Sequence, residues 1–374
     1  MLYITRLRST PPSNLFQTLG VAAVLGLGAL ATGCGGGGGS SAAVVPVHAS
    51  PGFDLAKDVH PFDPALVKQW PGLPNVGTSC YVNAGIKLLA AMPELDPFLV
   101  AEPADDAATA EVRTSLRRII NFIRSGGVLV GAPERDAMGL LQAVFQAFAN
   151  HRDLRSSMVN IRGGGGFVTT VVNSSLKVLN VRNQFTMRVE VKNTPMNHPQ
   201  PPSYMTDHSN VLIVSTDPLN GAFDFTQVHN SADFIRLAFT EPCTFPSGQA
   251  AYTHHRVRTF PTLVPNHMVM EFNHQLGPTR ALPFSEQVVV PTYAVDRARM
   301  TETRQGDVPM RALAAAVYRP GHFWAVIRGE DGWYENNDAT PTRRVEMTDL
   351  DEQADPQGAL TRNLELVLYQ RSDS

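Results

Sequence analysis

The chain has 374 residues, of which 43% are hydrophobic and 17% are charged, a balance typical of a globular protein with one large or two small domains. A formal net charge of -3, with no basic stripe that alternates with aromatic residues, argues against nucleic acid as a partner. The 29 glycines and 28 prolines predict many loops.

The first segment, residues 1–33, has the features of an export signal. Arg6 and Arg8 supply positive charge, residues 15–30 are apolar but short for a membrane span, and small residues lead into Cys34. This pattern resembles a bacterial lipoprotein signal, in which Cys34 becomes the lipidated first residue. A plain signal peptide cut nearby, or an N-terminal anchor, is the alternative. We therefore expect an exported lipoprotein held at a membrane by a lipid on Cys34.

Residues 34–66 follow as a tether. They begin with GGGGGSS at 35–41 and continue as a stretch rich in proline, alanine and valine. Such a composition predicts a flexible linker. We expect residues 67–374 to form the folded domain.

Beyond residue 66 the sequence predicts helices first and strands later. Apolar residues at helical spacing predict three helices, at 81–92 with its start at Cys80, at 107–126 and at 134–151. β-Branched residues and partial alternation then predict strands at 167–173, 185–192, 210–216, 267–274, 286–295, 311–319, 322–328 and 365–371. We expect an α+β fold, with a helical half, a mostly antiparallel β half and an active site in the cleft between them.

The chain has three cysteines, Cys34, Cys80 and Cys243. No Cys-x-x-Cys pair occurs, so a cysteine zinc site is excluded, and we expect no metal or cofactor. If Cys34 is lipidated, a disulfide between Cys80 and Cys243 is the structural alternative to a functional role for Cys80.

Cys80 lies where a glycine-bearing loop, GLPNVGTS, gives way to an amphipathic stretch. A thiol in the first turn of a helix feels the positive end of the helix dipole, and we expect this to lower its pKa. A thiol nucleophile also needs a base close by, and the base needs an orienting group.

The candidate base is His322. It follows a glycine-bearing turn and begins a strand at 323–328, which a tight GEDG turn connects to a third segment ending in Asn336, Asn337 and Asp338. A hairpin of that length brings the Asn/Asp cluster back beside His322, where a side-chain oxygen fixes the tautomer of the imidazole. A surface histidine beside a surface loop is the alternative.

Asn75 lies five residues before Cys80. Its amide N–H is placed to donate to a developing oxyanion, which typically stabilises the transition state by about 3 kcal/mol. An Asx-turn residue that orders the loop is the alternative role.

Two stretches resemble the signature boxes of ubiquitin-specific proteases. Residues 72–83, GLPNVGTSCYVN, are similar to the cysteine box Gly-Leu-x-Asn-x-Gly-x-Thr-Cys-Tyr-x-Asn. Residues 321–338, GHFWAVIRGEDGWYENND, are similar to the histidine box, in which Gly-His-Tyr, an apolar strand and a tryptophan precede Asn/Asp-Asp. Weaker similarities follow in family order at 134–145, 281–293, 311–322 and 365–371. The resemblance covers the chain from about residue 70 to residue 371.

The resemblance implies a papain-like cysteine protease fold, with a helical thumb that carries the cysteine and a β palm that carries the histidine. By position in the boxes it implies Cys80 as nucleophile, His322 as base and Asn75 as oxyanion donor. The third triad position falls on Asn337, and the neighbouring acid Asp338 shares the orienting role or polarises the oxyanion.

The implied activity is that of a thiol-dependent deubiquitinase. It hydrolyses the bond after the C-terminal Gly-Gly of ubiquitin or a ubiquitin-like protein, without a cofactor and as a monomer. Ser79 stands where the family usually has threonine, and the four zinc cysteines of the family's fingers are missing, so we expect reduced, zinc-free fingers.

Combined with the export signal, these features predict an effector that acts on the ubiquitin conjugates of a host. Two other functions stay open from the sequence. One is a papain-like peptidase or transferase that acts on bacterial envelope substrates, and the other is a catalytically silent lipoprotein that binds a ubiquitin-like partner.

Overall fold

The computed structural model describes residues 2–3, 58–100, 105–127, 137–155, 166–181, 185–196, 201–209, 211–215, 228–246, 254–273 and 281–372. Residues 4–57, which include Cys34 and most of the predicted signal and tether, lie outside the described residues. Within the described part of the chain, no helix has both the length and the apolar character to cross a lipid bilayer.

The described residues form a mixed α+β fold with mostly antiparallel sheets. The α-helices are α1 (Cys80–Ala90), α2 (Ala107–Arg124), α3 (Ala137–Asn150), α4 (Val168–Val178) and α6 (Ser231–Thr240). Short 3₁₀ helices are η1 (Pro64–Gln69), η2 (Pro93–Phe98) and η6 (Met347–Leu350).

A ten-stranded sheet forms the centre of the molecule. Its main path runs β1 (Leu2–Tyr3), β4 (Val211–Ser215), β7 (His267–Asn273), β14 (Leu360–Arg371), β9 (Thr301–Arg319), β10 (His322–Arg328), β11 (Trp333–Asn336) and β12 (Arg343–Val345). Two further strands, β8 (Gln287–Asp296) and β13 (Gln353–Ala354), pair with β9 and β14. All described pairings in this sheet are antiparallel except that of β4 with β7.

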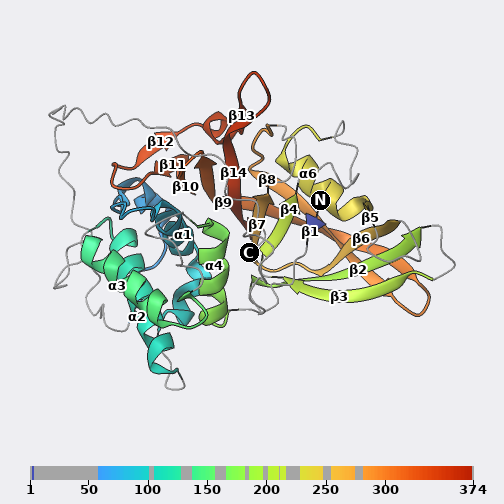
Figure 1. The fold of residues 1–374 in the computed structure, drawn as a ribbon, viewed down its shortest axis with the longest axis horizontal. Helices are drawn as coiled ribbons and strands as arrows, with labels where there is room; N and C mark the ends of the chain where they lie inside the picture. The colour runs from blue at the N-terminus through green and yellow to red at the C-terminus, as the bar shows by residue number, and fades with distance from the viewer. Residues whose placement is uncertain are drawn as a thin grey trace, which may run out of the picture.

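The two faces of this sheet pack into two separate hydrophobic cores. Along β10, Phe323 and Ala325 belong to the core shared with α1–α4, and the alternate residues Trp324 and Val326 belong to the core on the other face. The period of two in a strand produces this division. Figure 1 shows α1–α4 gathered on one side of the sheet and β2, β3 and β6 on the other.

Helix α1 lies at the centre of the helical core, and every one of its residues is buried. It packs against β10 and β9. Ala314 and Ala316 of β9, both without exposed surface, belong to the same core. Small side chains on the sheet let the helix approach closely, so the first residue of α1, Cys80, is held against the sheet.

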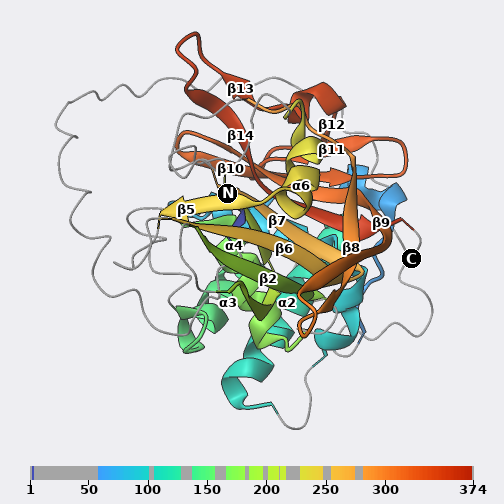
Figure 2. The ribbon, with the colours of Figure 1, turned by 90° about the vertical axis from the view of Figure 1, so that its right-hand side faces the viewer.

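A second, four-stranded sheet has the order β3 (Ser203–Ser209), β2 (Met187–Met196), β6 (His254–Leu263) and β5 (Cys243–Pro246). Figure 2 shows β5, β6 and β2 side by side, with α6 close to them. An edge-to-face contact between Phe260 of β6 and Tyr293 of β8, with ring centroids 5.2 Å apart, joins the two sheets.

Most of the predicted elements are confirmed, but the strand predicted at 167–173 is wrong. These residues lie in the segment that begins helix α4, because its buried positions recur at helical spacing: Val168, Val171, Val172, Ser175 and Leu176. Burial of this stripe against α1 outweighs the β propensity of the valines and threonines. Helix α6 and strands β3 and β6 were not among the predicted elements.

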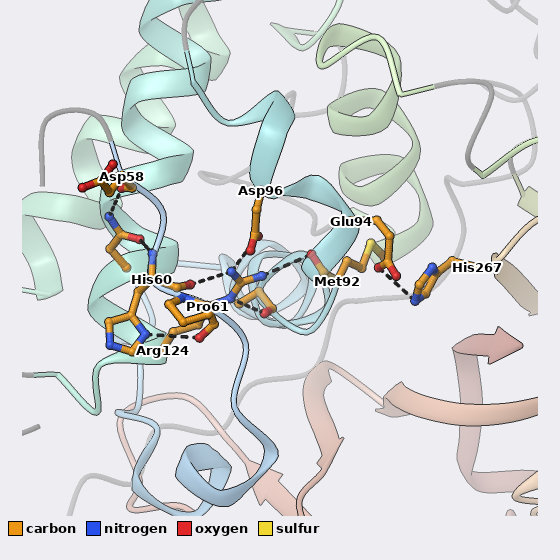
Figure 3. Close-up of polar contacts among 10 residues, drawn as sticks. Asp58, His60, Pro61, Met92, Glu94, Asp96, Arg124 and His267 are labelled. Atoms are coloured by element: carbon orange, nitrogen blue, oxygen red, sulfur yellow. Dashed lines mark hydrogen bonds and ion pairs between the residues drawn. The ribbon is translucent and has the colours of Figure 1, made fainter. Parts of the chain in front are cut away.

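Arg124 at the end of α2 secures the C-terminal end of α1. Its guanidinium has no exposed surface and donates to the carbonyl oxygens of Ala90 at 2.8 Å, Met92 at 3.1 Å and His60 at 2.7 Å, and to Oδ1 of Asp96 at 2.7 Å (Figure 3). Three of its partners are backbone carbonyls at or beyond the end of α1 and in the segment before η1. A single side chain therefore fixes α1, η2 and the segment before η1 together.

Candidate active site

The loop before α1 is folded by the hydroxyl of Ser79. This hydroxyl accepts from the backbone N–H of Val76 at 2.8 Å and donates to Oδ1 of Asn75 at 3.1 Å. Gly77, with φ of 66°, makes the turn between them in a conformation that favours glycine. Ser79 occupies the N-cap position but makes no side-chain cap bond, so the first amides of α1 stay available to groups at the helix start.

Cys80 is the first residue of α1 and is 6% exposed. It is a free thiol, so the alternative disulfide with Cys243 is not formed in the structure. The backbone amides of Phe323 in β10, of Tyr81 and of Cys80 itself lie close enough to the sulfur to lower the pKa of the thiol. The thiol therefore lies between the start of a helix and the start of a strand.

The pKa of Cys80 is raised, contrary to the prediction from the helix dipole alone. Burial is the largest influence and raises it, the Phe323 amide lowers it, and the negative charge of Asp338 raises it. The amides at the helix start act in the predicted direction, but desolvation outweighs them. The thiol therefore needs a neighbouring base to take its proton and form the thiolate.

His322 begins β10, directly after a turn in which Gly321 has φ of 84°. Its Nε2 lies 2.7 Å from Oδ1 of Asn337. A bond to this carbonyl oxygen requires the proton on Nε2, which leaves Nδ1 as the acceptor. Trp324 stacks on the imidazole, with ring centroids 5.9 Å apart and planes inclined by 24°. His322 is thus held in one tautomer and one orientation.

The expected hairpin produces this contact. β10 and β11 pair from Arg328 with Trp333 to Ala325 with Asn336, so the chain emerges from β11 beside the start of β10. The turn closes through the N–H of Gly329 and the carbonyl of Gly332 at 2.8 Å. The structure therefore brings His322, Asn337 and Asp338 together, as the spacing predicts.

Asp338 lies farther from His322 than Asn337 does. Its Oδ2 is 3.8 Å from Nε2 of His322, and its Oδ1 accepts from Nδ2 of Asn83 at 3.2 Å. The backbone of Asp338 has φ of 44°, which is uncommon for a residue other than glycine. Asn337 is therefore the direct partner of the imidazole, and Asp338 connects it to α1.

Asn83 is a site residue whose role was not predicted from the sequence. Its side-chain amide donates to the carbonyls of Leu73 at 3.4 Å and Pro74 at 3.1 Å as well as to Asp338. It lies three residues after Cys80 and so on the same face of α1. Its spacing of three residues from Cys80, inside the cysteine box, was the sequence feature that could have indicated a place in the site. Asn83 joins the loop before the cysteine to the loop after the histidine hairpin.

Asn336 was predicted as part of the cluster beside His322, but its side chain contacts a different segment. Its Nδ2 donates to the carbonyls of Trp70 at 3.2 Å and Pro71 at 3.3 Å and to Oγ1 of Thr342 at 2.6 Å. Gly72 packs so closely on the carbonyl of Asp338 that a Cβ would overlap it. These contacts hold residues 70–74, which lead into the cysteine, against the hairpin.

Asn75, the predicted oxyanion donor, is exposed. Its side-chain oxygen Oδ1 accepts a hydrogen bond from the hydroxyl of Ser79, so its Nδ2 is the group left to donate to other partners. Cys34 lies outside the described residues. Among the residues that the structure describes, no group of three or more His, Cys, Asp and Glu side chains is arranged to hold a metal ion.

Comparisons with known proteins neither add to this geometry nor contradict it. No protein-family model matches the chain, and no curated protein matches it. The chemistry of the site therefore rests on its own residues: a buried thiol, an oriented imidazole and amide donors at a helix start, which together suit nucleophilic attack on a carbonyl.

Proposed function

We propose that the chain is a thiol-dependent deubiquitinase of the ubiquitin-specific protease type. In this proposal α1–α4 form the thumb of a papain-like fold, the ten-stranded sheet forms the palm, and the sheet of β3, β2, β6 and β5 takes the place of zinc-free fingers. The observation that carries the proposal is the placement of Cys80 against the strand that begins with the oriented His322.

The proposed reaction starts with proton transfer from Cys80 to Nδ1 of His322. The thiolate attacks the carbonyl carbon of the last glycine in the C-terminal Gly-Gly of ubiquitin or a ubiquitin-like protein. The Asn75 amide and the N–H of Cys80 stabilise the resulting oxyanion. His322, held by Asn337, then protonates the leaving amine or hydroxyl. A water molecule activated by His322 hydrolyses the thioester and restores the thiol.

Ubiquitin labelling tests this function. Purified wild-type protein incubated with ubiquitin that carries a cysteine-reactive group at its C-terminus should gain the mass of one ubiquitin on a denaturing gel, and Cys80→Ala should not. A reduced, folded wild-type protein that stays unmodified would reject ubiquitin as the acyl substrate. In that case a ubiquitin-like modifier or a bacterial envelope substrate becomes the better candidate.

Export as a lipoprotein with a lipid on Cys34 belongs to the same proposal. It would bring the enzyme to host conjugates through release or from within a host cell. Incorporation of labelled palmitate into the wild-type chain, and its loss in Cys34→Ser, would support this part. An unlabelled wild-type chain would remove it.

The two candidate orienting residues should differ in their importance. A hydrogen bond to a charged group contributes about 1.5–3 kcal/mol, so we expect Asn337→Ala to lower kcat by roughly 10–150-fold, with KM little changed. Asn337→Asp keeps an acceptor oxygen and should retain most of the activity. Asp338→Asn should have a smaller effect, because its contact with His322 is 3.8 Å rather than 2.7 Å. Steady-state kinetics on a fluorogenic ubiquitin substrate measure all three, and a larger loss in Asp338→Asn would reverse the assignment.

A further inference from the structure

Ser79, the residue before α1, is fully buried, and its hydroxyl is turned away from the helix. A serine at the N-cap position usually accepts a hydrogen bond from a backbone N–H in the first helical turn, but Ser79 makes no such bond. Its hydroxyl accepts from the N–H of Val76 at 2.8 Å and donates to Oδ1 of Asn75 at 3.1 Å. The hydroxyl therefore binds the loop that carries the candidate oxyanion donor.

The backbone on both sides of Asn75 is held by hydrogen bonds. The carbonyl of Pro74, just before it, accepts from Nδ2 of Asn83 at 3.1 Å. The N–H of Val76, just after it, donates to Ser79. Asn75 itself is exposed, so its side chain depends on hydrogen bonding more than on packing for its orientation. The bond from Ser79 to Oδ1 supplies that orientation from a buried, fixed position.

The same bond decides which end of the Asn75 amide is left to act on a substrate. A hydroxyl carries one proton, and that of Ser79 is given to Oδ1, so Nδ2 is left to donate. Rotated by half a turn, the amide would present its oxygen to the oxyanion, and the two electron-rich atoms would repel each other. Oxyanion donors are effective because they are oriented before the reaction starts, so the anchor on Oδ1 matters for the donor on Nδ2.

We propose that Ser79 is a positioning residue that orients the Asn75 amide for stabilisation of the oxyanion. The inference rests on the proposed function in taking Cys80 as the nucleophile and Asn75 as the oxyanion donor, but it does not require ubiquitin as the substrate. Ser79 acts through Asn75 and does not contact the reacting atoms. It therefore accelerates reactions of Cys80 that pass through an oxyanion and leaves other reactions of the thiolate unchanged.

Two small electrophiles separate these two kinds of reaction. The thiolate of Cys80 adds to the carbonyl of 4-nitrophenyl acetate and forms a tetrahedral oxyanion, which expels 4-nitrophenolate and leaves an acetyl thioester. With iodoacetamide the thiolate displaces iodide from carbon, and no oxyanion forms. Site-resolved mass spectrometry follows both rates at Cys80 alone. The ratio of acylation to alkylation rate then measures how well the site stabilises an oxyanion.

Ser79→Ala should lower the acylation rate and leave the alkylation rate unchanged. The loss of one neutral hydrogen bond corresponds to a change of roughly 3–10-fold, and we expect the ratio to fall by that factor. Asn75→Ala and Asn75→Asp, which both lack the donor, should lower it further, by roughly 100-fold. Ser79→Thr keeps the hydroxyl and should restore most of the ratio. Ser115→Ala, which removes another buried hydroxyl that donates within α2, is the control and should change neither rate.

The route through Asn75 is tested by the double variant. If Ser79 acts by orienting this amide, Ser79→Ala should lower the ratio little further in the Asn75→Ala background. An equal loss in both backgrounds, a parallel fall in acylation and alkylation, or an unchanged ratio in Ser79→Ala would overturn the inference.

Two further results bear on it independently of the folding of Ser79→Ala. An unchanged ratio in Asn75→Ala would remove the oxyanion donor and the inference with it. A Ser79→Thr variant that is alkylated normally but acylated no faster than Ser79→Ala would also overturn it. A ratio that depends on Ser79 in a protein that ubiquitin fails to label would reject the proposed substrate and keep the role of Ser79.

Discussion

Replacing Cys80 by alanine is expected to abolish turnover and to leave the fold intact. The nucleophile forms the covalent intermediate, so its removal should lower kcat on a ubiquitin substrate by on the order of 10⁴-fold or more. The thiol is buried at 6% exposure, but only one atom is lost. The midpoint of thermal unfolding should therefore change little, and the circular dichroism spectrum should match that of the wild-type protein.

Two companion variants show whether the loss is chemical. Cys80→Ser keeps the shape of the side chain and places a much weaker nucleophile in a site that already raises the pKa of the thiol, so it should be as inactive as alanine. His322→Ala should keep a thiol that reacts slowly with the ubiquitin probe. Substantial turnover by Cys80→Ala would refute the assignment of the nucleophile, and with it the proposed mechanism.

The environment of His322 could be predicted because the interactions that define it are local. Two strands joined by a tight turn fix their own register, and Gly321 and the GEDG turn stand where positive φ or a close turn is needed. The contact of His322 with Asn337 follows from counting residues around that hairpin. The start of α1 at Cys80 was predictable for the same reason, since a loop with Gly77 precedes an apolar repeat.

The environments of Asn83 and Lys87 could not be predicted in the same way. Asn83 contacts Asp338 across 255 positions of sequence, and only the packing of α1 against the sheet brings them together. Lys87 reads in the sequence as the polar member of an amphipathic helix. The structure buries α1 on every side, so the side chain of Lys87 also lies in the core.

Helix α4 shows how burial decides secondary structure where propensity is ambiguous. Read over seven residues, Val168, Thr169, Val171 and Val172 satisfy a strand pattern. Over the eleven residues of α4 the buried positions keep the helical spacing to Leu176, and the buried C-cap residue Leu179 continues it. A short apolar run cannot be assigned from periodicity alone, and here its neighbour α1 supplies the face that it covers.

Replacing Arg124 by methionine is expected to give the largest loss of stability. The change removes the hydrogen bonds that Arg124 donates to the carbonyls of Ala90, Met92 and His60 and its ion pair with Asp96. Removing one partner of a buried ion pair typically lowers the free energy of unfolding by about 3–5 kcal/mol. We expect a loss of about 3 kcal/mol here, because the Asp96 side chain is 26% exposed. Urea unfolding of the wild-type protein and the variant measures the difference. Arg152→Met, at a side chain that is 88% exposed, is the control and should change stability by less than about 0.5 kcal/mol.

The pH dependence of this loss identifies its cause. Burial raises the pKa of Asp96, and Arg124 lowers it, so in Arg124→Met the folded-state pKa should rise further above its unfolded value. The variant then carries an unpaired buried carboxylate at neutral pH and a protonated, neutral one at lower pH, so its deficit should narrow as the pH falls. Adding Asp96→Asn should recover part of the loss at pH 7. If neither change reduces the deficit, the ion pair is unimportant and the three carbonyls account for the loss. In either case the end of α1 is released, and because Cys80 begins that same helix, the active site should lose its order before the sheet does.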